Sequence, residues 1–155
     1  MIKDTIGKQI TDAMKAKDGV RLSTLKMLSA ALTNAEIEKM RVKLTEEEEL
    51  AVVRKEAKKR KDAIEIYKKL QDSKTQKLQA EKNVEREEEE LKVLQEFLPK
   101  EISDEELTAL IDQTIEETGA SEMKDMGKVV GKVMAKAGGA VEGSRVASVV
   151  KEKLI

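Results

Sequence analysis

The sequence predicts an all-α protein, and three observations support this fold class. The chain has one Phe, one Tyr and no Trp, so the aromatic residues that favour strands are nearly absent. Charged residues make up 39% of the chain, well above the roughly 25% of average globular proteins, which is typical of long solvated helices. Apolar residues also recur three and four positions apart along most of the chain, the spacing of one helix face.

The first part of the chain predicts four helices, over about residues 2–17, 20–40, 46–70 and 75–98. Gly19 is expected to end the first helix in the left-handed conformation. Thr45 and Glu48 have the spacing of a capping box at the start of the third helix. The polar segment 71–76 is expected to break the chain between the third and fourth helices.

Pro99, the only proline, predicts a domain boundary, because proline disfavours helical backbone in the residue before it. We therefore expect an N-terminal helical domain over residues 1–98 and a small three-helix domain over 99–155. In the second domain, Ser103 and Glu106 predict a capping box and Gly119 a helix end. Ser121 is expected to cap the next helix, which should end before Gly138, and a last helix is expected over about 143–154.

The composition excludes several kinds of chemistry. The chain has no cysteine and no histidine, so it lacks thiolate chemistry, disulfides and the commonest general base and metal ligand. It contains no P-loop and no metal-binding signature. We predict no catalytic residues, no cofactor and no metal site. The chain also lacks the roughly 20-residue apolar stretch of a membrane span and the apolar core of a signal peptide, which favours a cytoplasmic protein that does not enter membranes.

The strongest candidate site is a row of lysines beside a row of small residues on the expected helix that follows Ser121. Its members recur every four positions: Lys124, Lys128, Lys132 and Lys136, with Gly127, Gly131 and Ala135 alongside them. A cationic row beside a strip without side chains could receive a phosphate backbone. The alternative is a solvated lysine face with glycines that allow tight helix–helix packing.

A second basic cluster, and one pair of charges, lie in the first domain. The cluster comprises Arg54, Lys55, Lys58, Lys59, Arg60 and Lys61; helical winding spreads these residues around the axis, so a solvated helix with acidic partners is the favoured interpretation. Arg60 and Glu87 each interrupt an apolar stripe. Because a buried charge needs a partner, we predict a structural ion pair between Arg60 and Glu87.

Several segments together resemble the YqeY family. They are Glu90-Leu91, Val93-Leu94, Phe97-Leu98-Pro99, Ser103 to Leu107, Gly119-Ala120, Asp125 to Gly131 and Val150 to Leu154, with the basic run 54–62 in the first half. The Asp-Met-Gly-Lys segment, residues 125–128, is the most specific of them. This family is similar to the tail domain of the B subunit of glutamine-dependent aminoacyl-tRNA amidotransferase, a tail that reaches the outer corner of tRNA.

The resemblance implies a stand-alone tRNA-binding or amidotransferase-related accessory module, with tRNA or a translation-related protein as its partner. It links the chain to glutamine-dependent carbon–nitrogen ligase activity, but the catalytic parts of that enzyme lie outside the region of resemblance. We therefore expect no active site in this chain. The alternative function is a helical adaptor that binds another protein and never contacts RNA.

Overall fold

The structure, a computed structural model, describes residues 1–70, 77–138 and 140–154, and every regular element in these ranges is helical. The helices are α1 (Ile2–Lys15), α2 (Gly19–Glu38), α3 (Glu46–Leu70), α4 (Lys77–Gln95), α5 (Asp104–Thr118), α6 (Met126–Ala137) and α7 (Gly143–Lys153), with one 3₁₀ turn at Met123–Asp125. The predicted all-α class is confirmed. The predicted break at 71–76 lies outside the described residues.

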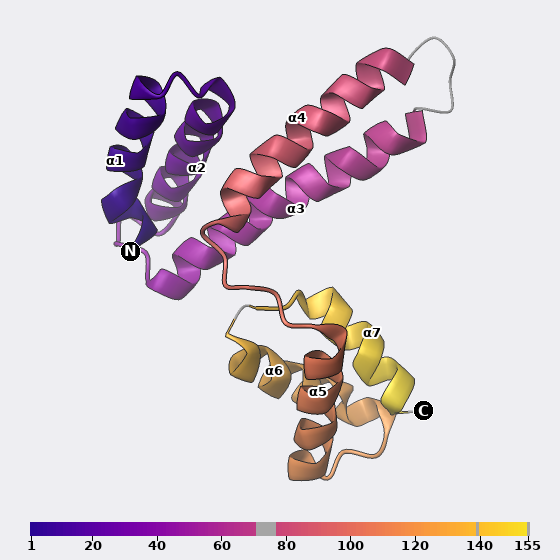
Figure 1. Cartoon of the computed structure of the whole chain (residues 1–155). Coiled ribbons are helices and arrows are strands. Elements are labelled where there is room, and N and C mark those ends of the chain that lie inside the picture. Colours follow the sequence, from indigo (N-terminus) through magenta and orange to yellow (C-terminus); the bar gives the residue numbers. More distant parts are fainter. Residues whose placement is uncertain (71–76, 139, 155) are drawn as a thin grey trace. The chain divides into compact units, whose positions relative to one another are not determined.

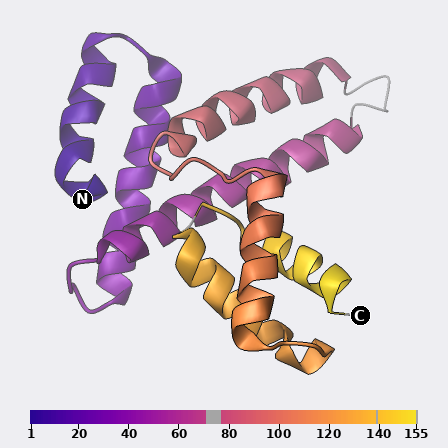
Figure 2. The same ribbon diagram turned by 60° about the horizontal axis from the view of Figure 1, so that its bottom comes forward.

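The helices form two compact units, Met1–Leu98 with α1 to α4 and Pro99–Ile155 with α5 to α7 (Figure 1). In the first unit, α1 and α2 run side by side, as do α3 and α4, in both views (Figures 1 and 2). The two expected helical groups are thus present. That each folds independently remains a prediction.

The core of the first unit lies where α2 meets the other three helices. Leu25, Leu28 and Leu32 of α2 are completely buried, as their spacing of three and four along one helix face requires. They share one cluster with residues from α1, α3 and α4, namely Ile6, Ala13, Val53, Ala57, Val93 and Leu94, and with Leu44.

Two helix ends in this unit differ from the prediction. Lys17, not Gly19, takes the left-handed conformation after α1, with a φ of 55°. Asp18 instead caps α2, since its carboxylate accepts a hydrogen bond from the Arg21 amide at 3.0 Å, and Gly19 is the first residue of that helix. Helix α4 ends at Gln95, earlier than the predicted residue 98. The Phe97 and Leu98 amides bond to carbonyls three residues back, which tightens the chain before Pro99.

The start of α3 bears out its predicted capping box. The Thr45 amide donates to Glu48 Oε2 at 2.7 Å, and the Glu48 amide donates to Thr45 Oγ1 at 3.3 Å. The adjacent Glu49 is completely buried, and its carboxylate accepts hydrogen bonds from the Ile2 and Lys3 amides at 2.6 and 3.2 Å. One side chain of α3 thereby satisfies two unpaired amides of the first turn of α1.

The turn after α2 contains a left-handed methionine, and relieving its strain should stabilise the protein. Met40 has a φ of 57°, and the Met40 and Arg41 amides bond to the carbonyls of Ile37 and Glu36. This pattern is a Schellman motif with methionine where glycine is usual. We expect Met40→Gly to raise the free energy of unfolding by roughly 0.5–1 kcal/mol, measured by urea denaturation. Met14→Gly, in α1, should instead lower it by about 1 kcal/mol; destabilisation by both variants would contradict this explanation.

The second unit has a core of aliphatic side chains from its three helices and from two residues beside α7, Val141 and Leu154. Its buried members are Leu107, Ile111, Val129, Val133, Val141, Val146, Val150 and Leu154. The Ser103–Glu106 capping box is confirmed, with both reciprocal bonds present. Gly119 and Gly138 end α5 and α6 with φ values of 65° and 56°, which glycine adopts without steric cost.

Ser121 was predicted to cap α6, but it does not. The Asp125 carboxylate accepts hydrogen bonds from the amides of Ser121 and Glu122 at 3.2 and 3.3 Å. These two bonds, together with the positive charges of Lys124 and Lys128, lower the pKa of Asp125. The chain passes through the 3₁₀ turn at 123–125 before α6 begins at Met126.

Candidate nucleic-acid interface

The lysine row and the small-residue strip of the sequence both lie on the solvent side of α6 and the turn before it. Lys124, Gly127, Lys128, Gly131, Lys132, Ala135 and Lys136 are all exposed. On the opposite side of the helix, Val129 and Val133 are completely buried in the core of the unit. The amphipathic pattern of α6 therefore turns the whole candidate surface outward.

The glycines of this surface are not packing positions within the second unit. A Cβ atom built on Gly127 or on Gly131 would meet no other atom within 4 Å. Glycine inside a helix costs about 1 kcal/mol relative to alanine, and no described contact within the second unit requires either one. The glycines therefore do not serve close packing of α6 against α5 or α7, and the strip is open within its own unit.

The four lysines differ in their partners. Lys136 Nζ donates to Glu117 Oε2 of α5 at 2.6 Å, and Lys124 pairs with Glu122 at 2.8 Å. Over the described ranges, Lys128 and Lys132 form no ion pair. The two central ammonium groups are thus the ones available to an anion.

The lysines of this face lower the pKa of two nearby carboxylates, Glu117 and Asp125. The hydrogen bond from Lys136 lowers the pKa of Glu117, and the charges of Lys136 and Lys132 act in the same direction. The pKa of Asp125 is lowered by the amides of Ser121 and Glu122 and also by Lys124 and Lys128. Because both carboxylates stay ionised near neutral pH, they compensate part of the lysine charge at the two ends of the row but leave its centre cationic.

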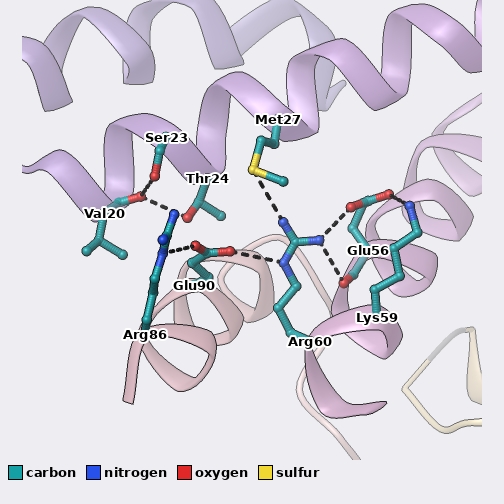
Figure 3. A network of polar contacts seen from close by, with 9 residues as sticks. All are labelled: Val20, Ser23, Thr24, Met27, Glu56, Lys59, Arg60, Arg86 and Glu90. Carbon is teal, nitrogen blue, oxygen red and sulfur yellow. Dashed lines mark hydrogen bonds and ion pairs between the residues drawn. The ribbon is translucent and has the colours of Figure 1, made fainter. Parts of the chain in front are cut away.

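Arg60 lies in a buried ionic network, but its partner on α4 differs from the predicted one. Arg60 Nε donates to Glu90 Oε2 at 3.3 Å, and Nη1 donates to Glu56 Oε2 at 2.6 Å (Figure 3). The structure places Glu90, rather than Glu87, in hydrogen-bond contact with Arg60. Glu90 has the core position because it precedes the buried Leu94 by one helical turn.

Further polar groups complete this network. Met27 Sδ of α2 accepts from Arg60 Nη2 at 3.7 Å, Arg86 donates to Glu90, and Lys59 donates to Glu56 (Figure 3). Burial alone raises the pKa of Glu56, but the bonds from Lys59 and Arg60 outweigh it and leave that pKa lowered. The network satisfies charges where α2, α3 and α4 meet, which is a structural role.

Glu87 is half-buried beside this network, and its pKa is raised by burial and by the charge of Glu90, against the opposing effect of Arg60 and Arg86. An acid whose folded pKa is raised destabilises the fold when ionised. Glu87→Gln should therefore raise the free energy of unfolding at pH 7, by less than about 1 kcal/mol. The gain over the parent should shrink as the pH falls through the raised pKa, which urea denaturation at several pH values can measure. A gain that grows toward low pH would contradict this explanation.

Within residues 1–70, 77–138 and 140–154, no group of three or more acidic side chains is arranged to hold a metal ion. No helix in the same ranges is long and apolar enough to cross a membrane.

Comparison with known proteins places the chain in a family. The model of the Yqey-like protein family matches residues 3–154, nearly the whole chain. The chain belongs to the YqeY family. A comparison with curated proteins gave no match. The family match covers both helical units, so the α6 surface and the Arg60 network both lie within the family's region.

Proposed function

We propose that this YqeY-family protein is a tRNA-binding accessory module whose α6 surface contacts the phosphate backbone. The observation that carries the proposal is the exposed centre of that surface, where Lys128 and Lys132 form no ion pair with any described residue and the adjacent Gly127 and Gly131 leave open space within their unit. Ammonium groups beside bare backbone are suited to phosphate oxygens, which fix position without reading bases. The resemblance to the amidotransferase tail supports tRNA as the nucleic acid.

The geometry limits what kind of recognition this surface provides. Lysines that recur every four residues contact a backbone as point charges, so preference for tRNA would come from its shape and not from base reading. The proposal assigns binding to this chain. Any amide-transfer chemistry would belong to a partner.

Salt dependence of binding tests the proposal. The logarithm of tRNA affinity should fall linearly with the logarithm of salt concentration, by roughly 0.7–0.9 for each phosphate contact. Fluorescence anisotropy with labelled tRNA over a range of salt concentrations measures this slope. Absence of binding at low salt would refute the proposal.

A protein-binding adaptor is the second candidate, favoured by one observation. The open strip over Gly127 and Gly131 would let the backbone of a partner helix approach α6 closely, as small residues allow. A pull-down from lysate distinguishes the two functions: ribonuclease treatment should abolish capture if RNA is the partner and leave a protein complex intact if it is not.

A further inference from the structure

The basic cluster at the centre of α3 is divided by the structure into an inward and an outward part. Arg60 points into the buried network, and Lys59 pairs with Glu56 at 2.5 Å. Glu56 is therefore occupied by these two bases. In the part of the chain that the structure describes, Arg54, Lys55 and Lys58 form no ion pair.

Arg54 has a second unusual property. Its Nε is the only buried side-chain nitrogen or oxygen in the described ranges that has no hydrogen-bond partner. Arginine cannot give up its charge at physiological pH, so this donor cannot be relieved by deprotonation. A buried donor without an acceptor is costly, and in native proteins it commonly marks a bound water or ion.

Arg54 and Lys58 lie on the same side of α3. Residues four positions apart on a helix are neighbours, with about 5–6 Å between their Cβ atoms, close enough for both to reach one phosphate group. Lys58 is exposed and Arg54 half-buried. Asp62, four residues beyond Lys58, is the nearest acid along this side, yet it forms no ion pair with Lys58 in the described structure.

We propose that Arg54 and Lys58 form an oxyanion site on α3 that takes a phosphate group. A modest rotation of the Arg54 side chain, of the kind that commonly accompanies binding, would turn its Nε and Nη donors toward the anion. The planar fork of arginine binds a phosphate through two bonds, and Lys58 adds a point charge. The phosphate could be free or part of an RNA backbone. The site belongs to the first unit and does not depend on the function proposed for α6.

The direct test is NMR of the Arg54 Nε–H signal in ¹⁵N-labelled full-length protein during titration with inorganic phosphate, at constant ionic strength set by chloride. The signal should shift and saturate. Lys58→Gln should weaken phosphate binding by about three- to tenfold, and Arg54→Gln should abolish it. Lys55→Gln removes the same charge one residue from Arg54, on a different side of the helix, and should leave the affinity unchanged.

A shift that rises linearly without saturation, or an equal effect of Lys55→Gln, would mean an adventitious ion only and would overturn the site. Because Lys58 is exposed, its variant remains informative even if Arg54→Gln does not fold. Titration with an RNA oligonucleotide distinguishes the source of the phosphate: loss of RNA affinity in Lys58→Gln supports a backbone phosphate, and an unchanged RNA affinity with weakened phosphate binding supports a free one.

Discussion

Replacing Arg60 with methionine should lower the free energy of unfolding by about 3 kcal/mol, the largest stability change that we expect from a single polar substitution. The exposed fraction is 5% for Arg60, 7% for Glu56 and 4% for Glu90. Methionine fills much of the same space but supplies no charge, so two buried carboxylates lose their shared partner. Lys59 and Arg86 remain near them, which keeps the loss below the upper end for stranded buried charges.

A compensating variant separates the charge effect from lost packing. If the cost comes from stranded carboxylates, adding Glu56→Leu and Glu90→Leu to Arg60→Met should recover most of the stability, since apolar replacement of a whole buried network is often neutral. Urea denaturation followed by circular dichroism gives the three free energies. A loss below about 1 kcal/mol in the single variant, or no recovery in the triple variant, would contradict the role assigned to the network.

Charge reversal on α6 should have the largest effect on binding. In Lys128→Glu/Lys132→Glu, two favourable phosphate contacts become two repulsions, so we expect tRNA affinity to fall at least tenfold at low salt and the salt slope to flatten by about 1.4–1.8. Both side chains are exposed, so the helical signal in circular dichroism should be unchanged.

The control is a variant with the same change of charge elsewhere. Lys8→Glu/Lys15→Glu reverses two exposed lysines of α1 and alters the net charge of the protein equally. It should affect tRNA binding much less. Equal loss in both double variants would show that binding depends on overall charge rather than on α6.

Most of the fold could be predicted from local signals because these act within one or two helical turns. The Thr45–Glu48 and Ser103–Glu106 boxes and the stop at Gly119 depend on residues three or four apart, and all three are present. The prediction for Gly19 was wrong because the capping carboxylate of Asp18 decided where α2 begins. The sequence alone does not show which of two such adjacent signals prevails.

Contacts between distant residues were harder to predict. Glu49 and Glu90 each lie one turn before a buried apolar residue, Val53 and Leu94, so their burial was detectable from spacing. Their partners on α1 and α3 were not detectable from spacing. Whether Glu90 or Glu87 contacts Arg60 depends on how α4 is rotated about its own axis against α3. The open space beside Gly127 and Gly131 could not be predicted either, since glycines at this spacing suit close helix packing equally well.

The most direct test of the α6 surface is an NMR titration of ¹⁵N-labelled protein with tRNA, read at the backbone amides of Gly127, Lys128, Gly131 and Lys132. These four signals should shift or broaden saturably at low salt and recover at high salt, while amides of α1 and α2 stay unchanged. If tRNA leaves the four α6 signals unaffected, or affects the first unit alone, α6 is not the nucleic-acid interface of this protein.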